Sequence, residues 1–357
     1  MKINCGRTWP FTSGGGARAI LRFGSFTVRR RQRYWTRSRK EGLEAYAYLA
    51  PAGIVLFTFW FLPVLASILI SFTNWKGGDR LENIRWIGLT NYRRALIGDK
   101  AEYMWDAFFN TVNYALYSVP ITLVLALVVA LLLNAPIKGR AFFRTVYFLP
   151  FITTWVAISI VWKYFYDPNA GVLNWLLGTE NLDWLDDSRR LWTMWLWGPL
   201  GLGDVVRSPL LTGPSISMLA IIITSVWRDI GYYAIIFLAG LQNIDRSYYE
   251  AAAIDGASPA QQFWTITFPL LSPVTFFLLI ISGIGAFKIF VPMLVMTPTG
   301  GPDFTTASMT FYLYQQGFTG SWLLGYASAV AYILFVIILL LTLLQNRLFG
   351  RKVHYES

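Results

Sequence analysis

Cysteine and histidine, the residue types that most often carry metal, redox and nucleophilic chemistry, occur once each in this 357-residue chain, as Cys5 and His354. A single thiol cannot form an internal disulfide, and one Cys with one His falls short of the ligand set of a structural zinc site. A catalytic Ser–His pair would have to use His354, close to the C-terminus. These counts exclude a disulfide framework and a Cys/His zinc site, and they disfavour a hydrolytic enzyme.

The charged residues that could do chemistry are those inside apolar stretches. Arg228 and Asp229 fall near the middle of the stretch 215–241, and Lys288 falls inside 270–296. A charge at the centre of a membrane helix costs about 2.5–3.5 kcal/mol, so its default interpretation is functional. The structural alternative is that Arg228 and Asp229 only neutralise partners; for Asp229, Lys288 is one candidate.

The composition indicates which elements must position these charges. Hydrophobic residues make up 55% of the chain, charged residues 14%, and the mean hydropathy is +0.47. Soluble domains carry about 25% charged residues, so we expect an all-α polytopic membrane protein. A membrane helix needs about 20 mostly apolar residues. Six transmembrane helices are predicted, over residues 46–72, 110–133, 145–166, 215–241, 270–296 and 323–344.

Basic residues predict the orientation of these helices. Residues 1–44 hold 11 of the 30 Lys and Arg residues and two acids. With six spans both termini share one side, which carries 18 basic residues against nine in the opposite loops. The positive-inside rule therefore predicts that both termini are cytoplasmic. We interpret residues 1–44 as a disordered, lipid-attracted basic tail rather than a nucleic-acid-binding arm. Residues 45–349 would form the membrane domain and 350–357 a second cytoplasmic tail.

The predicted outer loop 167–214 is rich in tryptophan. Such side chains often lie at a membrane interface or pack on helix ends. A dedicated partner-binding surface is the alternative. The tryptophans concerned are Trp175, Trp184, Trp192, Trp195 and Trp197.

One predicted cytoplasmic loop, residues 242–269, has a strong local pattern. Ser247 and Glu250 have the spacing of a capping box, and Gly256 is typical of the residue that follows a helix end. We therefore expect a short helix from Ser247 that ends near Gly256.

A second short helix should follow the turn. Ser258 and Gln261 repeat the capping-box spacing, and Pro259 takes the favoured first helical position. The small side chains of residues 251–253 would let another surface approach closely. From these residues alone, the loop is either a docking element or simply a capped turn.

The spacing in this loop resembles a family motif. Glu-Ala-Ala at 250–252 is followed at fixed distances by Gly256, Ile266 and Pro269. This pattern is similar to the EAA loop of binding-protein-dependent ABC importer permeases, with Phe268 where the family usually has Leu. In that family the loop docks on a cytoplasmic ATPase subunit. The residues that carry this role here would be Glu250, Ala251, Ala252, Asp255, Gly256, Ile266 and Pro269.

The resemblance covers about residues 44–349 and is closest to the maltose, trehalose and glycerol-3-phosphate permeases. It implies a type I ABC importer permease fold. The further segments that carry it are SFTNW (71–75), GLTNYRRAL (88–96), FFNTVNY (108–114), LLLNAPIKGRAFFRTVYFLP (131–150), WRDIGYYAIIFLAGLQNI (227–244) and MTPTGGPDF (296–304).

The resemblance also implies partners and a location. The chain would form a heterodimer with a second permease subunit in the bacterial inner membrane, with two ATP-binding subunits beneath and an extracytoplasmic solute-binding protein outside. Because the chain has no Walker A sequence, it would bind no cofactor itself, and ATP and Mg would be used by the ATPase subunits. It would not be an enzyme.

Substrate positions follow from the same resemblance. In maltose-type permeases the helices that flank the EAA loop hold the substrate. The matching polar positions, with the adjacent Tyr233 and the intramembrane Lys288, are Ser225, Arg228, Asp229, Tyr232, Tyr233, Ser282 and Lys288. Gly285, Ala286 and Ile289 replace larger or amide side chains of the maltose binder, which favours a different or bulkier glycan, a di- or oligosaccharide.

Three alternatives remain. Within the family the substrate could be glycerol 3-phosphate or a polyol. A secondary transporter would show inverted repeats and broken helices, and a membrane enzyme would need a His, Cys or carboxylate cluster at one depth. The sequence shows none of these features convincingly.

Overall fold

The computed structural model describes residues 32–136, 138–179, 182–202, 208–320 and 322–350. Within those residues all regular elements are helices, and the β-structure is limited to two isolated bridges. Its contacts divide the chain into two units, residues 1–63 and 64–357, which are described separately.

The first unit contains a long apolar helix. Helix α1 runs from Gln32–Leu56 and continues through a π-helical turn, Phe57–Phe61, into α2, Leu62–Ser71. The stretch Lys40–Ser71 is long and apolar enough to cross a membrane, and none of its most apolar window is buried. Residues 32–44, which we expected in a disordered tail, are helical here, whereas residues 1–31 of that tail lie outside the described residues.

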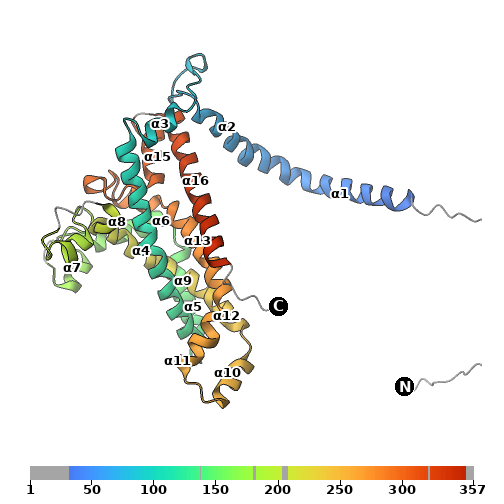
Figure 1. Ribbon diagram of the computed structural model, residues 1–357, viewed down its shortest axis with the longest axis vertical. Helices are drawn as coiled ribbons and strands as arrows, with labels where there is room; N and C mark the ends of the chain where they lie inside the picture. Colours follow the sequence, from blue (N-terminus) through green and yellow to red (C-terminus); the bar gives the residue numbers. More distant parts are fainter. Residues whose placement is uncertain (1–31, 137, 180–181, 203–207, 321, 351–357) are drawn as a thin grey trace, which may run out of the picture. The chain divides into compact units, whose positions relative to one another are not determined.

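Two long helices form the centre of the second unit (Figure 1). Helix α4 covers Ala101–Asn134 and α9 covers Ile216–Asn243. Fully buried alanines, among them Ala126 and Ala130 of α4 and Ala234 of α9, let the two backbones approach closely. Small residues are the usual means of tight helix packing in membranes, where apolar burial gives no drive between helices.

The predicted span 145–166 is not one straight helix. The structure has α5, Arg140–Ile152, and α6, Trp155–Phe165, bent by 97° relative to each other. Thr153 and Thr154 adopt extended backbone angles, and the Thr154 hydroxyl accepts a hydrogen bond from the Ala157 amide at 3.4 Å. Because Thr154 caps a new helix, the first helix ends here. The six predicted spans therefore correspond to five long helices and one bent pair.

The predicted span 270–296 is also interrupted. Helix α13, Ser272–Phe287, is followed by a break at Lys288 and then by α14, Val291–Met296. Side chains from the start of α15 compensate the interruption: the Ser308 hydroxyl donates to the Ile289 carbonyl at 2.8 Å. Such compensation is required wherever a helix breaks at membrane depth.

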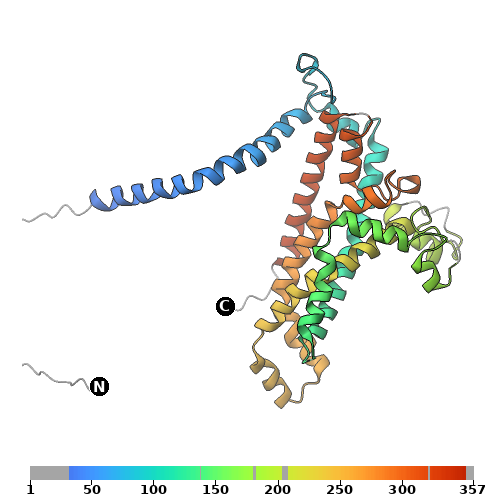
Figure 2. The ribbon, with the colours of Figure 1, turned by 180° about the vertical axis from the view of Figure 1, so that it is seen from behind.

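The remaining elements are shorter, apart from the last helix. Helix α16, Leu324–Phe349, is the fifth long apolar helix. It packs against α13, α15 and α3 (Figure 2). The other helices are α3 Thr90–Leu96, α7 Val172–Leu177, α8 Pro209–Thr212, α10 Arg246–Ile254, α11 Pro259–Gln262, α12 Phe268–Leu270 and α15 Met309–Phe318. The 3-10 and π turns are η2 Leu81–Asn83, η3 Thr193–Trp197, η4 Phe263–Thr267 and η5 Pro302–Phe304.

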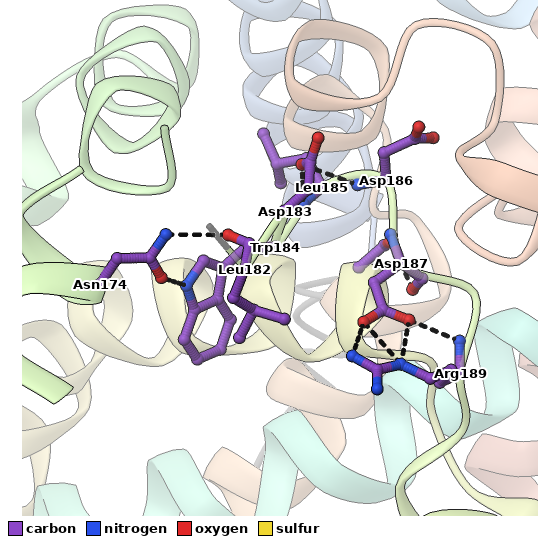
Figure 3. A network of polar contacts seen from close by, with 9 residues as sticks. Asn174, Leu182, Asp183, Trp184, Leu185, Asp186, Asp187 and Arg189 are labelled. Carbon is purple, nitrogen blue, oxygen red and sulfur yellow. Dashed lines mark hydrogen bonds and ion pairs between the residues drawn. The ribbon is translucent and has the colours of Figure 1, made fainter. Parts of the chain in front are cut away.

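Polar contacts within the outer loop connect its segments to one another (Figure 3). The Trp184 indole donates to the Asn174 side-chain oxygen at 2.7 Å, and the Asn174 amide donates to the Leu182 carbonyl at 2.9 Å. Nearby, the Arg189 guanidinium donates to Asp187 and lowers the pKa of that carboxyl below its usual range.

Tryptophans of this loop do not share one environment. Trp184 is buried in the core, which agrees with packing against helices and not with an interfacial position. Trp175 and Trp195 are 82% and 75% exposed. The other two, Trp192 and Trp197, donate through their indole nitrogens to the Tyr117 hydroxyl and the Leu211 carbonyl.

Candidate functional site

The loop between α9 and α13 forms the helix–turn–helix that its sequence predicts. Helix α10 ends at Ile254, and Gly256 has a φ of +79°, in the left-handed region that glycine adopts without strain. Ser258 and Gln261 form a complete capping box at the start of α11, with Pro259 in the first turn. These parts of the prediction are confirmed.

The start of α10 differs from the prediction. The helix begins at Arg246, and Asp245 caps it by accepting a hydrogen bond from the Ser247 amide at 2.9 Å. This bond keeps the pKa of Asp245 below its usual range. Ser247 therefore lies inside the first turn and forms no capping box with Glu250. Aspartate is as good a cap as serine, and here it comes first along the chain.

The loop projects from one end of the bundle, opposite to α3 and α15 (Figure 1). No residue of α10 is buried, and the Ile254 side chain is 88% exposed. Glu250, Ala251, Asp255 and Gly256 are exposed as well.

Two contacts stiffen the projecting loop. The Tyr249 hydroxyl lies 2.9 Å from the Thr267 hydroxyl, which connects α10 to the returning segment. The Gln262 amide donates to the Ala257 carbonyl at 3.2 Å. Of the predicted loop residues, Ala252, Ile266 and Pro269 are half-buried. The arrangement is a braced, protruding element with a small-residue surface.

A cavity of about 450 Å³ lies among α4, α9, the α5–α6 bend and the α13–α14 break. All seven residues that we predicted for a substrate pathway line it. Six more polar or aromatic residues join them. The predicted set is Ser225, Arg228, Asp229, Tyr232, Tyr233, Ser282 and Lys288. The structure thus brings together side chains from helices that are distant in sequence.

Arg228 is engaged on several sides. Its Nη1 lies 2.5 Å from an Asp229 carboxylate oxygen, and its Nη2 donates to the Phe151 carbonyl at 3.1 Å. The guanidinium carbon lies 4.8 Å from the ring centre of Phe151 and 4.2 Å from that of Trp155, which places two cation–π contacts on it. Arg228 therefore ties α9 to both sides of the α5–α6 bend, and Asp229 pairs with Arg228 rather than with Lys288.

Aromatic rings form part of the cavity wall. Tyr232 stacks on Phe151 with ring centres 4.2 Å apart and planes 7° apart, and Tyr233 packs edge-on against Tyr232 at 5.2 Å. Aromatic faces beside hydroxyl groups suit a ligand that has both C–H surfaces and hydroxyls.

Two serines contribute oxygen acceptors. Ser225 donates its hydroxyl proton to the Ile221 carbonyl at 2.8 Å, and Ser282 donates to the Leu278 carbonyl at 2.6 Å. Because each proton is directed back to the helix, each hydroxyl oxygen can act toward a ligand only as an acceptor.

The sequence analysis did not predict the contributions of α4 and of the bend. Tyr114, Ser118 and Thr122 line the cavity from α4, and Phe151 and Trp155 line it from the bend. The α4 residues recur every four positions, so they form one polar stripe in an otherwise apolar helix. That spacing was a usable signal. The bend residues gave none, because their position depends on the 97° turn.

Among the described residues, no three His, Cys, Asp or Glu side chains are placed to hold a metal ion. The groups around the cavity can hydrogen-bond, stack and bind by charge.

Comparisons with known proteins agree with this architecture. Residues 101–354 match the family model described as a binding-protein-dependent transport system inner membrane component. The chain is 36% identical over 321 residues to the probable ABC transporter permease protein YesP of Bacillus subtilis, covering 89% of this chain and 94% of that protein. It is 31% identical to the sn-glycerol-3-phosphate transport system permease protein UgpA of Agrobacterium fabrum, covering 87% and 96%.

Solved structures share the fold. The chain superposes on a chain of a bacterial alginate ABC transporter in complex with an alginate pentasaccharide-bound periplasmic protein, with a TM-score of 0.70 and 21% identity, covering 91% of this chain and 100% of that chain. The lactose transport system permease protein LacF of Rhizobium radiobacter is another relative, 32% identical over 85% of this chain and 93% of that protein. This multi-pass membrane chain therefore belongs to the inner membrane component family of binding-protein-dependent transport systems, the ABC importer permeases.

Proposed function

We propose that this chain forms the translocation path for a carbohydrate, a di- or oligosaccharide, in an ATP-driven importer. The observation that carries the proposal is the cavity beside α9, where Tyr232 and Tyr233 offer aromatic faces and Ser225 and Ser282 offer oxygen acceptors. Relatives named for lactose and glycerol 3-phosphate support this substrate class. A glycerol-3-phosphate or polyol permease is the second candidate, favoured by the UgpA relatives.

The proposal includes the coupling step. Helix α9 ends at Asn243, and α10 starts three residues later, so the cavity wall and the protruding loop belong to one continuous segment. ATPase subunits, which would bind ATP and Mg, dock on this loop in the proposal. Their closure moves α10 and, with it, the wall of the cavity, which alternates access between the two sides. A second permease subunit completes the path, and a solute-binding protein delivers the substrate.

Uptake by proteoliposomes tests the mechanism. The complex of this chain with its partner permease, ATPase subunits and binding protein is reconstituted, and uptake of a radiolabelled saccharide panel is measured. We expect uptake that stops without internal ATP and survives a protonophore. Uptake that collapses with the proton gradient and ignores ATP would instead identify a secondary transporter. Uptake of glycerol 3-phosphate but of no saccharide would select the second candidate.

A further inference from the structure

Three charged residues line the cavity, as far as the described part of the chain extends: Arg228, Asp229 and Lys288. Arg228 and Asp229 form an ion pair whose side chains are 13% and 23% exposed. Together they contribute no net charge. The cavity therefore carries the single positive charge of Lys288.

Arg228 is held mainly by groups of the protein. Its terminal nitrogens donate to the Asp229 carboxylate and the Phe151 carbonyl, and its buried Nε has no acceptor among the described residues. The rings of Phe151 and Trp155 lie against the guanidinium carbon. Arg228 thus acts as a positioning residue for the bend.

Lys288 has the opposite environment. Its side chain is exposed to the cavity, and within the described chain its ammonium group has no hydrogen-bond acceptor and no ion-pair partner. It follows the last residue of α13, where the negative end of the helix dipole favours a cation. The dipole satisfies none of the three ammonium donors.

A cation without a partner at membrane depth calls for an anion. The groups around Lys288 are those that suit a sugar: the Ser282 oxygen one helix turn and a half earlier, and the tyrosine faces of α9. An anion carried by the substrate itself would meet Lys288 while its rings meet the aromatic wall.

We propose that the cavity selects an anionic carbohydrate, and that Lys288 receives its negative group. This inference rests on the proposed function and narrows its substrate class from saccharides in general to those bearing a carboxylate or a phosphate. A cavity of about 450 Å³ lies within the range of small-molecule sites, about 300–1,000 Å³, which fits a short acidic saccharide rather than a long polymer.

The test uses the assembled complex in lipid nanodiscs without binding protein, so that the permease alone determines affinity. Binding of digalacturonate, of its neutral methyl ester and of glycerol 3-phosphate is measured for the wild type, Lys288→Met, Lys288→Arg and Lys163→Met. Lys163 is an exposed lysine in the last turn of α6 that does not line the cavity, so its loss is the matched control for net charge.

We expect the wild type to bind an acid about tenfold to a hundredfold more tightly than the ester, as charge-assisted hydrogen bonds imply. Lys288→Met should remove that preference by lowering the affinity for the acid to that for the ester, whereas Lys288→Arg and Lys163→Met should retain it. Lys288-dependent binding of digalacturonate identifies a carboxylate, and of glycerol 3-phosphate a phosphate.

Equal affinity of the wild type for acid and ester would overturn the inference while the carbohydrate path stands, and would point to a carboxylate of the partner subunit as the counter-ion. Equal loss of both ligands in Lys288→Met would overturn it by making Lys288 a structural residue. Binding of none of the three probes by an assembled, ATP-hydrolysing complex would overturn the inference together with the carbohydrate function.

Discussion

Gly256 shows how much one residue can determine in the protruding loop. Its φ is +79°, and a Cβ built on it would meet nothing within 4 Å. Any penalty for a side chain there comes from the backbone alone. Because an L-residue in the left-handed region costs about 1–2 kcal/mol, a β-branched residue would turn the loop away from this geometry.

We therefore expect Gly256→Val to abolish binding-protein-stimulated ATPase activity and uptake while the chain still inserts. Gly256→Asn is the matched control, since asparagine tolerates this region, and it should retain most activity. Full stimulation in the assembled Gly256→Val complex would contradict a docking role for the turn.

The ion pair between Arg228 and Asp229 should contribute to the stability of the complex. Replacing either member leaves a partly buried charge without its partner, so Arg228→Ala and Asp229→Asn should each lower the thermal stability of the complex. Arg228→Ala combined with Asp229→Asn should recover part of the loss, with a coupling of about 0.5–3 kcal/mol in a double-mutant cycle of unfolding. Strictly additive effects would show that the pair is not energetically coupled.

The sequence does not predict this pair, for a physical reason. Residues adjacent in a helix point in directions about 100° apart and seldom face each other, so the pattern favours a partner for Asp229 on another helix, at Lys288. The long Arg228 side chain bends back across that angle because the Phe151 and Trp155 rings hold its guanidinium. Those rings come from a bend that hydropathy does not reveal.

At the scale of elements, the sequence predicts helix caps and turns but not the breaks within apolar segments. Asp245, Gly256, Ser258 and Pro259 act through short-range backbone chemistry, so the helix–turn–helix of the loop could be predicted apart from its first cap. The break at residues 153–154 follows Pro150 in the last turn of α5, but a proline inside an apolar stretch does not by itself predict a 97° bend. Arg228 of α9 also contacts both sides of the bend, and a window of hydropathy cannot contain such contacts.

Helices α5 and α9 approach each other very closely at Gly231. A Cβ on Gly231 would lie 1.8 Å from the Tyr147 carbonyl oxygen and 2.4 Å from its carbon, so the two backbones touch with no side chain between them. Gly231→Ala should separate the helices and lower the free energy of unfolding by at least about 1–3 kcal/mol, the cost of an overpacked core. This loss should be measured as a lower melting temperature of the complex.

Gly53→Ala is the control for this prediction. Gly53 is also helical, and a Cβ there would meet nothing within 4 Å. Its replacement should leave the melting temperature unchanged or slightly raised, since alanine favours a helix. An equal, small effect of both substitutions would show that α5 and α9 are not in backbone contact.

At the scale of the whole molecule, the described helices leave much apolar surface uncovered. Even the most buried spans, α4 and α9, have 44% and 50% of their most apolar windows buried, and α16 has 22%. Lipid can cover part of this surface, but patches of this size also mark protein interfaces.

We expect the chain purified alone in detergent to melt several degrees lower than the same chain purified with its partner permease, because a partner that binds only the folded state stabilises it. A co-purified ATPase subunit without the partner permease serves as the control and should give a smaller shift. Identical melting temperatures with and without the partner permease would argue against a heterodimer.

Helix α9 gives the molecule a mechanical property. Its 28 residues form a rod about 42 Å long at 1.5 Å per residue, with the cavity residues near its middle and the projecting loop at its end. The distance from Ser225 to Asn243 is about 27 Å by the same rise. Gly231 and Arg228 attach this rod to α5 beside the cavity, and α4 packs against it. In the proposed transport cycle, a displacement of the loop would therefore reach the cavity wall through a single continuous helix.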